Sequence, residues 1–300
     1  MNGLLLNSPM YVNWNYTYRC NFNCSHCYSR NRTDIEELSF SQKKQIANNI
    51  IRNKVFLVNL GGGEPLLCDD CFDIIQHLRS NNVQVNVSTN GWKITDDCIK
   101  RLQNVRLSGV SVSLDNICPE KHDELRNKQG SYEEACSAIQ RFAKADIKVH
   151  VSTVITQDNY DGLKSLFVQC QEMGVNSIDL KRLKTMGNAS GLGDKDLTTE
   201  QMLFLYQQMP QWKNDFSMAI NLVYGTKRIP GIDAGCPCGK TALAIMCNGD
   251  ISPCVYNIRV IGNALVDDIH DVWVNSEELN YLRTHFECVG LAKDKTINKS

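Results

Sequence analysis

The 300-residue sequence has no marked excess of charge, because 32 Lys and Arg residues stand against 33 Asp and Glu residues and the formal net charge is −1. A basic surface for nucleic acid or for an anionic membrane is therefore not expected. No apolar run approaches the roughly 20 residues that cross a bilayer. The N-terminal MNGLLLNSPM has no basic region and too short an apolar run for a secretory signal. We therefore expect a cytoplasmic protein with no nucleic-acid or membrane partner.

The sequence also has no solenoid repeat and no low-complexity tail. Instead, β-rich runs alternate with amphipathic segments. The β-rich runs cover residues 11–16, 55–60, 83–88, 110–114, 147–154 and 177–183, and helical patterns cover 40–52, 71–80, 94–102, 131–145 and 159–174. This alternation predicts βα units on a parallel sheet. A complete TIM barrel needs eight units, so six units predict an α/β fold with a partial (β/α)6 TIM-type barrel, open on one side.

A second domain is expected after the barrel. A Gly-rich loop at 184–197 is followed by a predicted helix at 198–209, with Thr198 or Thr199 near its N-cap. From about residue 217 the pattern changes to short strands, turns and cysteines. So short a stretch buries little core of its own. We therefore expect a barrel domain over 1–215 and a small metal-stapled domain over 216–300.

Fourteen cysteines in a chain without a secretory signal require an explanation. Disulfides are disfavoured in a reducing compartment, so metal binding or catalysis is favoured. Cys20, Cys24 and Cys27 lie together directly after the first predicted strand, at the edge where parallel α/β sheets bind ligands. Zinc prefers four ligands, usually in two separated pairs, and His26 is awkwardly placed between two of these cysteines. Three cysteines instead suit a [4Fe–4S] cluster with one iron left open for a ligand.

The segment Cys20-Asn21-Phe22-Asn23-Cys24-Ser25-His26-Cys27-Tyr28 resembles the C-x3-C-x2-C motif of the radical SAM superfamily. Three further segments resemble motifs of that family, each at the end of a predicted strand. They are Gly61-Gly62-Gly63-Glu64-Pro65, Ser88-Thr89-Asn90-Gly91, and Ser111-Val112-Ser113-Leu114-Asp115 with the following His122-Asp123 and Leu125-Arg126. One departure is Asn116, which stands where the family's maturase branch usually has glycine.

The resemblance implies a set of site residues. Cys20, Cys24 and Cys27 would bind the cluster. The segment with Gly62, Gly63, Glu64 and Pro65 would hold the amino group of S-adenosylmethionine (SAM), and Ser88 and Asn90 would lie near its ribose. Arg126 would meet the SAM carboxylate, Ser113 and Asp115 would line the cavity, and Tyr28 would pack near the adenine or serve as an ordinary packing tyrosine.

The chemistry implied by the resemblance is reductive cleavage of SAM. The reduced cluster passes one electron to the sulfonium, and a 5′-deoxyadenosyl radical then removes a hydrogen atom from the substrate. The protein supplies orientation and exclusion of water. An electron donor such as a flavodoxin or ferredoxin is implied as a partner.

The C-terminal cysteines resemble the first half of a SPASM domain, or its shorter Twitch version, which holds an auxiliary iron–sulfur cluster. Cys236, Cys254 and Cys288 would be ligands, with Cys238 as the best fourth. A zinc site of the same cysteines is the alternative. Asn248-Gly249 predicts a hairpin turn that returns Cys254 to Cys236. Cys247 is interpreted as a spare ligand, a core thiol or the hydrogen-atom donor of a radical epimerase.

Three functions stay open from the sequence. The first is a radical SAM enzyme that modifies a peptide or a peptide-like product, although the barrel begins too early to leave room for an N-terminal leader-binding module. The second is a radical epimerase or dehydrogenase of a small molecule such as an amino sugar. The third is a non-enzymatic, zinc-stapled binding module. Lys181, Arg182 and Lys184 could meet an anionic group of the substrate or form a solvated basic face.

Overall fold

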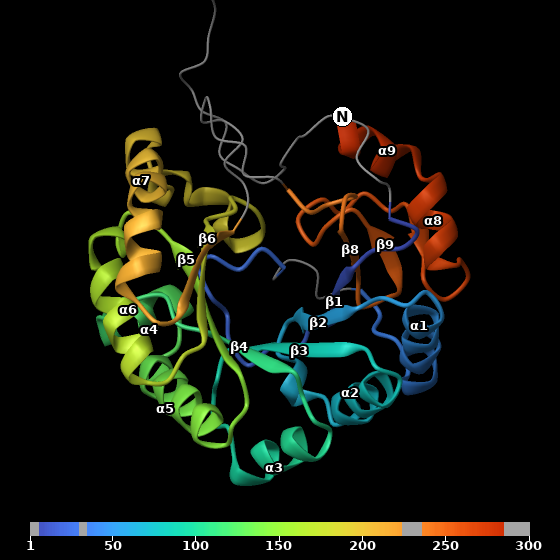
Figure 1. The fold of residues 1–300 in the computed structure, drawn as a ribbon, viewed down its shortest axis with the longest axis horizontal. Helices are drawn as coiled ribbons and strands as arrows, with labels where there is room; N and C mark the ends of the chain where they lie inside the picture. Colours follow the sequence, from blue (N-terminus) through green and yellow to red (C-terminus); the bar gives the residue numbers. More distant parts are fainter. Residues whose placement is uncertain (1–5, 30–34, 224–235, 285–300) are drawn as a thin grey trace, which may run out of the picture.

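The computed structural model describes residues 6–29, 35–223 and 236–284. Ten strands form one curved sheet in the order β10-β9-β8-β1-β2-β3-β4-β5-β6-β7. Helices α1 to α7 lie around the outside of the curve, and α8 and α9 lie beside β8 and β9 (Figure 1). The predicted α/β class with a partial barrel is confirmed.

The strands are short, as is usual for a barrel. Their bounds are β1 Tyr11–Thr17, β2 Leu57–Gly62, β3 Gln84–Thr89, β4 Gly109–Ser113, β5 Val149–Ile155, β6 Ser177–Arg182, β7 Ala219–Val223, β8 Ala242–Ile245, β9 Asp250–Ser252 and β10 Gly262–Asn263. Neighbouring strands from β1 to β7 pair in parallel.

The helices follow the strands in βα order. Their bounds are α1 Phe40–Arg52, α2 Asp70–Ser80, α3 Asp96–Asn104, α4 Pro119–Arg126, α5 Ser131–Lys144, α6 Leu163–Glu172, α7 Thr199–Asp215, α8 Ile269–Asn275 and α9 Glu277–Thr284, with short 3-10 turns η2 at Pro65–Leu67, η3 at Tyr160–Gly162, η4 at Gly187–Gly191 and η5 at Gly193–Lys195. The helix α1 has the predicted bounds because Ser39 and Gln42 form a capping box at its start.

The sheet continues past the six predicted units. β7 pairs with β6, and β8 pairs in parallel with β1 on the other side of the sheet. β8 and β9 form the predicted hairpin, whose turn contains Gly249 at φ +89°. The predicted division at residue 215 therefore falls inside a stretch that contributes strands to one sheet, and the domain boundary stays a prediction.

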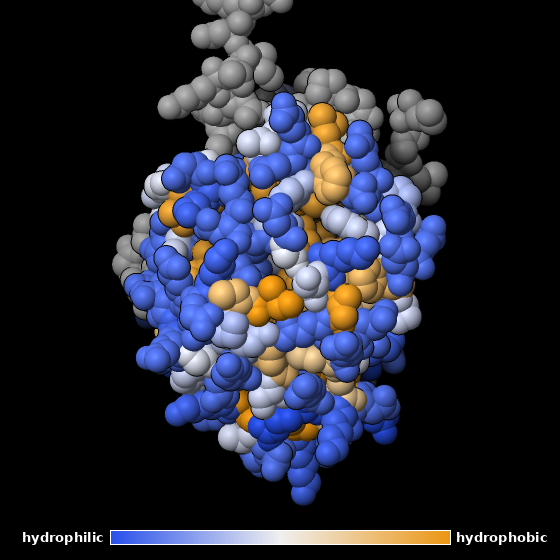
Figure 2. All heavy atoms as spheres, turned by 90° about the vertical axis from the view of Figure 1, so that its left-hand side faces the viewer, coloured by the Kyte–Doolittle hydropathy of each residue, from blue (hydrophilic) through white to orange (hydrophobic). Residues whose placement is uncertain are grey.

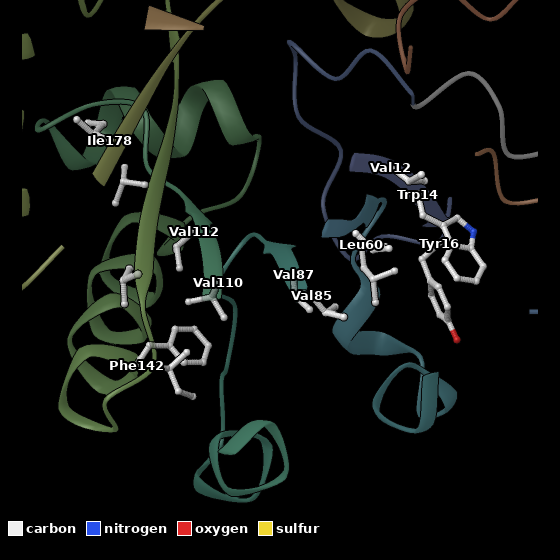
Figure 3. Packing of buried hydrophobic residues seen from close by; sticks show 14 of the residues in the cluster. Val12, Trp14, Tyr16, Leu60, Val85, Val87, Val110, Val112, Phe142 and Ile178 are labelled. Carbon is white, nitrogen blue, oxygen red and sulfur yellow. The ribbon is translucent and has the colours of Figure 1, made fainter. Parts of the chain in front are cut away.

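The strands alternate between apolar and polar residues, and this alternation forms the core. Val12, Val58, Val85, Val110 and Val149 belong to the buried apolar set, which packs under the helices. Figure 3 shows Val110 and Val112 of β4 beside Phe142 of α5. Since successive side chains point to opposite faces of a strand, the alternate polar residues point into the barrel. The apolar face stabilises the fold and the polar face is left for a ligand.

The C-terminal segment is fastened to the barrel through α1. The buried Asn49 side chain donates to the carbonyl oxygens of Ala264 (2.9 Å) and Asp267 (2.7 Å) and accepts from the Ile269 amide. The fully buried Trp273 of α8 donates its indole N–H to the Leu6 carbonyl (2.7 Å). These bonds satisfy polar groups that would otherwise be buried without partners. These bonds hold the strands β8, β9 and β10 beside β1.

The helix α7 is longer than predicted. We expected it to end at Met209, before Pro210, but it continues to Asp215 with the proline inside. The last turn contains Trp212, which is buried and packs edge-on against Phe167 at a centroid distance of 5.2 Å. Burial of this ring offsets the roughly 3 kcal/mol that a proline costs inside a helix. The prediction was wrong because tertiary packing is not visible in the local sequence.

The face over α6 and α7 is mainly hydrophilic, with separate hydrophobic spots (Figure 2). Val168 of α6 and Phe204 of α7 are among the exposed apolar residues there. Isolated apolar side chains of this kind are ordinary on a protein surface. Among the helices within the described residues, none is long and apolar enough to span a bilayer.

Candidate functional site

A cavity of about 330 Å³ lies inside the barrel. Its size is in the range of small-molecule sites. The inward-facing positions of the strands line it, and these include Asn13, Asn59, Ser88, Ser111, Ser113, Ser152 and Lys181. The side chains of Asn13, Asn59 and Ser88 are linked, because Ser88 Oγ donates to Asn59 Oδ1 (3.2 Å) and Asn59 Nδ2 donates to Asn13 Oδ1 (3.5 Å). The floor of the cavity is thus an ordered polar surface.

The loop after β1 places Cys20, Cys24 and Cys27 on the wall of this cavity. None of the three forms a disulfide. Polar groups lie beside all three sulfurs. The Phe22 amide donates to Cys20 (3.4 Å) and Asn90 Nδ2 lies 4.0 Å from it, Arg126 Nη1 lies 4.0 Å from Cys24, and Ser29 Oγ lies 3.4 Å from Cys27. Burial raises the pKa of the Cys20 thiol to about 11 and raises that of Cys24, where Arg126 opposes the shift. Such donors are what stabilise thiolates bound to iron.

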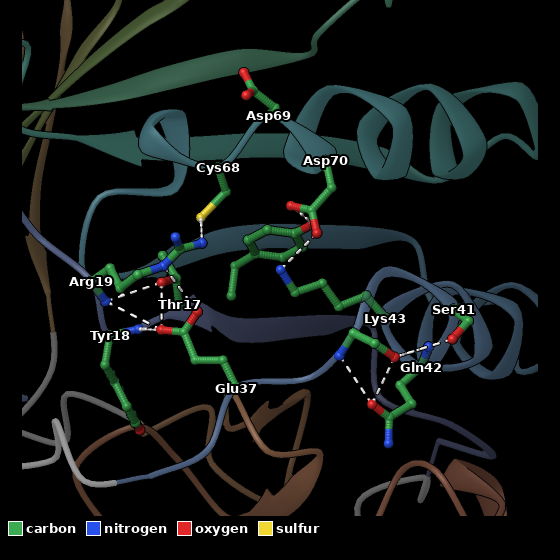
Figure 4. Close-up of polar contacts among 12 residues, drawn as sticks. Thr17, Tyr18, Arg19, Glu37, Ser41, Gln42, Lys43, Cys68, Asp69 and Asp70 are labelled. Carbon is green, nitrogen blue, oxygen red and sulfur yellow. Dashed lines mark hydrogen bonds and ion pairs between the residues drawn. The ribbon is translucent and has the colours of Figure 1, made fainter.

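Glu37 fixes the start of this loop from outside the cavity (Figure 4). Its carboxylate accepts from Thr17 Oγ1 (2.6 Å), from the Tyr18 amide (2.7 Å) and from the Arg19 amide (3.3 Å). Burial raises the pKa of Glu37, but these hydrogen bonds outweigh burial and the net pKa is lowered. The Arg19 guanidinium donates to the Cys68 sulfur (3.2 Å) and so ties the loop to the start of α2.

Two glycines bring the end of β2 against the cysteine loop. The Gly63 amide donates to the Thr17 carbonyl (2.6 Å) and the Glu64 amide donates to the Arg19 carbonyl (2.9 Å). A Cβ on Gly62 would lie 2.3 Å from the Thr17 carbonyl oxygen, and one on Gly63 would lie 2.1 Å from that of Arg19. Only glycine permits this approach. Both glycines line the cavity, whereas Pro65 is buried behind it at the start of η2.

Replacing Gly63 by alanine is expected to push the cysteine loop away from β2, because the new methyl group overlaps a backbone carbonyl that cannot rotate aside. We expect a stability loss of about 1–3 kcal/mol, the usual range for an overpacked buried site, together with a lower iron content. The measurement is urea unfolding and iron analysis of anaerobically purified protein. Gly61→Ala is the matched control, since its Cβ would meet nothing closer than 3.7 Å. Equal effects at the two positions would contradict this account.

Glu64 is a buried carboxyl directly behind the cavity wall. It is 4% exposed, and it accepts from the Asn90 amide (2.7 Å) and the Leu66 amide (3.3 Å). Burial raises the pKa of Glu64 to about 7, and the hydrogen bonds oppose this shift only in part. A buried carboxylate without a cation is unfavourable. An ammonium group arriving from the cavity would supply the missing charge.

This shift predicts a pH dependence of stability. The folded state holds the Glu64 proton up to about pH 7, whereas the unfolded chain releases it near pH 4.5. The contribution of Glu64 to the free energy of unfolding is therefore fully present below pH 4.5 and is lost as the pH rises to about 7. The loss is roughly 3 kcal/mol at 1.36 kcal/mol per pKa unit. We expect Glu64→Gln to remove this slope, measured as the difference between the two proteins in urea unfolding at a series of pH values without SAM; parallel profiles would contradict it.

Arg126 reaches the cavity from the end of α4 and is held by Asp115. Its Nε and Nη2 atoms each lie 2.6 Å from Asp115 Oδ2. Asp115 is fully buried and does not line the cavity, in contrast to our expectation, because its carboxylate is turned to Arg126 and to the Val154 amide (2.9 Å). Burial raises the pKa of Asp115, but the charge of Arg126 lowers it. The charges and hydrogen bonds around the carboxylate outweigh burial, so the net pKa is lowered. Ser113, the last residue of β4, does line the cavity.

The histidine and aspartate of the same motif orient this arginine. The Asp115 amide donates to His122 Nδ1 (3.1 Å), which fixes the start of α4 against the end of β4. Asp123 accepts from the Gly130 amide (2.6 Å), Ser131 Oγ (2.8 Å) and the Tyr132 amide (2.9 Å), and so joins α4 to α5. These are positioning contacts, and neither side chain lines the cavity.

Three other predicted residues lie on the cavity wall. They are Tyr28, Ser88 and Asn90. Asn90 Nδ2 donates to Asn21 Oδ1 (2.8 Å), which links the end of β3 to the cysteine loop. Tyr28 donates to Asn15 Oδ1 (3.2 Å) and packs edge-on against Tyr256 at 4.9 Å. Tyr28 therefore connects the cysteine loop to the C-terminal segment.

The second group of cysteines lies on the same cavity. Cys236, Cys238 and Cys254 all line it. The Cys238 thiol is hydrogen bonded to both other sulfurs, which raises the pKa of Cys238 and lowers those of Cys236 and Cys254. The hairpin turn thus returns Cys254 to the other two, as the Asn248-Gly249 pattern predicted. Cys288, the remaining predicted ligand, lies outside the described residues.

Cys247 follows β8 and is 1% exposed. Its carbonyl accepts from the Leu38 amide (3.4 Å), and burial raises the pKa of its thiol to about 12. It is not among the residues that line the cavity. A role as hydrogen-atom donor needs access to the substrate, and so this role gains no support from the position of the side chain.

Some cavity residues were not predicted from the sequence. Asn13, Asn59 and Ser152 belong to this set, and so does Tyr256. The first three carry a usable signal, because they occupy the polar positions of strands whose alternate positions are apolar. Tyr256 follows β9 in an irregular segment and carries no such signal. His26 lines the cavity too, but its Nδ1 atom is buried without a hydrogen-bond partner.

The donor set fits iron–sulfur clusters better than single metal ions. Within the residues that the structure describes, no three His, Cys, Asp or Glu side chains are arranged to hold one ion. A cluster needs no such convergence, since each thiolate binds a different iron. Cys20, Cys24 and Cys27 would hold the first cluster, and Cys236, Cys238 and Cys254 would contribute to the second. The zinc alternatives gain no support from this geometry.

Comparison with known proteins gives the family. A family model described as the radical SAM superfamily matches residues 14–167, and one described as the SPASM iron–sulfur cluster-binding domain matches residues 236–296. The mycofactocin maturase MftC of Mycolicibacterium smegmatis is 32% identical over 93% of this chain and 73% of its own length. The AdoMet-dependent heme synthase of Oleidesulfovibrio alaskensis is 24% identical over 93% of this chain and 78% of its own length.

Solved structures share the fold. The crystal structure of Streptococcus suis SuiB bound to S-adenosylmethionine superposes with a TM-score of 0.79 at 19% identity, covering 93% of this chain and 69% of that one. The cofactors that belong to the two matched models are a [4Fe–4S] cluster with SAM and auxiliary iron–sulfur clusters. A non-enzymatic zinc-stapled module is thereby excluded. The chain belongs to the radical SAM superfamily and is an enzyme with a C-terminal SPASM iron–sulfur domain.

Proposed function

We propose that this enzyme is a maturase that modifies a peptide by removing a hydrogen atom from it inside the barrel. The observation that carries the proposal is that both groups of cysteines line one cavity. When bound, the first cluster and SAM supply a 5′-deoxyadenosyl radical for hydrogen abstraction. The peptide class is supported by the mycofactocin maturase, the relative at 32% identity. Another relative, at 24% identity, is named a heme synthase, and the experiment below therefore compares a peptide with a non-peptide substrate.

The chain's own residues prepare the site for this reaction. Cys20, Cys24 and Cys27 would bind the first cluster and leave one iron without a protein ligand. The carboxyl of Glu64, with the backbone at Gly62 and Gly63, would accept from the ammonium group of SAM. Arg126, fixed by Asp115 at 2.6 Å, would meet its carboxylate. The fixed orientation of these groups lowers the entropic cost of reaching the reactive geometry.

The cavity also has to exclude water from a reactive radical. Tyr28 and Tyr256, whose rings are in edge contact on the cavity wall, would contribute to this exclusion. An auxiliary cluster held by Cys236, Cys238 and Cys254, together with Cys288, would lie on the same wall and could accept an electron from the substrate. The single-electron donor to the first cluster would be a small redox protein such as a flavodoxin or ferredoxin.

The test is turnover with a peptide. Anaerobic enzyme with rebuilt clusters, SAM and dithionite is incubated with a short peptide encoded beside its gene, made with deuterium at the carbon-bound positions of its residues in turn. We expect deuterium to enter 5′-deoxyadenosine and the peptide mass to change in the same reaction. Deuterium transfer from an amino sugar but from no peptide would overturn the peptide class, and an absence of 5′-deoxyadenosine would overturn the proposed function.

A further inference from the structure

Lys181 is a cation on the cavity wall that the proposed reaction does not use. It lies near the end of β6, and its side chain is half-buried and lines the cavity. The alternation of β6 explains its direction, because Ile178 and Leu180 are fully buried under the helices and Asp179 and Lys181 occupy the opposite face. Figure 1 shows β6 on the other side of the sheet's curve from β8 and β9. Lys181 therefore faces the cavity from the wall opposite to β8 and β9.

We propose that Lys181 binds a carboxylate of the peptide substrate and so selects which part of the peptide enters the cavity. This inference rests on the proposed function and deepens it. The carboxylate has two sources in a peptide, the C-terminus and an acidic side chain, and they present the same chemistry to a lysine.

The other charges near Lys181 already have partners. Arg126 is paired with Asp115 at 2.6 Å, and Arg182, which also lines the cavity, is paired with Asp196 at 2.8 Å. Asp179 accepts from Asn221 Nδ2 at 3.0 Å. Over residues 6–29, 35–223 and 236–284, the Lys181 ammonium has no ion pair within 4 Å and no hydrogen bond. Asp179 attracts this ammonium through space without a hydrogen bond to it. The hydrogen-bond donors of the ammonium are thus left for a ligand.

The surroundings of this ammonium favour a carboxylate ligand. Val154 of β5 and Val223 of β7 are its partners in the sheet register, and both line the cavity. Flanking valines reduce access of water, and a charge–charge hydrogen bond is stronger where water is reduced. Ser113 and Ser152, which pair across β4 and β5, add hydroxyl donors on the same wall. Burial lowers the pKa of Lys181 and Asp179 opposes this, as expected for a cation that gains from an incoming anion.

The second lysine on this wall has a different position. Lys184 follows β6 and lies over the Tyr256 ring, at 5.3 Å from its centroid. The hydrogen bonds from Cys238 lower the pKa of Cys236 and of Cys254, and the charge of Lys184 lowers both in the same direction. Lys184 is therefore directed to the second group of cysteines, and Lys181 is the residue that faces open cavity.

The test measures binding rather than turnover. Anaerobic holoenzyme saturated with SAM is titrated calorimetrically with three peptides. The first is acetyl-trialanine with a free C-terminal carboxylate, the second is acetyl-trialanine amide, which has no carboxylate, and the third is acetyl-Ala-Asp-Ala amide, which has an acidic side chain only. We expect the wild type to prefer one carboxylate probe to the amide. Lys181→Met should weaken that probe about 10- to 100-fold, the equivalent of a hydrogen bond to a charged group, and should leave the amide unchanged. The probe that responds identifies the source of the carboxylate.

Lys148→Met is the matched control, since Lys148 is exposed on the loop before β5. Equal binding of all three probes by the wild type would overturn the proposal. So would an equal loss of SAM affinity in Lys181→Met, because the lysine would then serve the SAM carboxylate. Binding is read without turnover, so a failure of the proposed function, seen as an absence of 5′-deoxyadenosine from the wild type, is distinguished from a failure of this inference.

Discussion

Replacing Cys24 by alanine is expected to abolish SAM cleavage while leaving the fold and the second iron site in place. Cys24 is the most buried of the three front cysteines at 9% exposure, and Arg126 lies 4.0 Å from its sulfur. Loss of one of three thiolates removes the cluster that would be reduced. We expect the rate of 5′-deoxyadenosine formation to fall by at least about a thousandfold, a few kcal/mol of the barrier.

The measurement combines product formation with iron analysis. Iron content should fall only in part, since the C-terminal cysteines that would hold auxiliary iron are unchanged. Cys98→Ala is the control, because Cys98 is a partly buried thiol on α3 that does not line the cavity. Full activity in Cys24→Ala, or complete loss of iron with loss of helical circular dichroism, would contradict the assignment.

Replacing Asp115 by asparagine is expected to have the largest effect on stability. The variant keeps the shape of the side chain but leaves Arg126 buried without its counter-ion, and Arg126 is 8% exposed. Breaking a buried ion pair at one partner costs about 3–5 kcal/mol, because an uncompensated charge stays inside the protein. Urea unfolding of the anaerobic protein measures this loss.

The exposed pair of Arg52 and Asp268 provides the comparison. The side chain of Arg52 is 62% exposed, and its Nη2 atom lies 2.8 Å from Asp268 Oδ2. Arg52→Gln should cost no more than about 1 kcal/mol, as is usual for a surface ion pair. If Asp115→Asn costs no more than Arg52→Gln, the Asp115 carboxylate does not hold Arg126 in the way described. SAM affinity measured on the same proteins should fall only in Asp115→Asn.

Local signals in the sequence predicted the parts of the fold that local interactions decide. The amphipathic pattern at 40–52 predicted α1, whose start is fixed by the capping box at Ser39, and the turn at Asn248-Gly249 predicted the β8–β9 hairpin. The order of the cysteine, glycine and serine motifs along the chain predicted which strand ends meet at the cavity. Ten of the thirteen predicted front-site residues do line it.

The remaining parts depend on tertiary packing and could not be predicted in this way. Glu64 and Asp115 lie behind the wall because each is turned to a partner that the sequence does not identify, the Asn90 amide and Arg126. The meeting of the two cysteine groups on one cavity requires β8 to pair with β1, whose partners, such as Tyr11 and Ala242, are far apart in the sequence. The polar interior of the barrel was predictable in principle, since Asn13, Asn59 and Ser111 alternate with buried apolar residues along their strands.

The central claim is that the cluster on Cys20, Cys24 and Cys27 keeps one iron open for SAM. The most direct measurement is electron–nuclear double resonance on the dithionite-reduced enzyme, mixed with SAM labelled with 15N at its amino group and frozen. We expect a 15N hyperfine coupling to the cluster that is absent without SAM and in Cys24→Ala. A reduced cluster whose spectrum shows no 15N coupling at saturating SAM would contradict the claim.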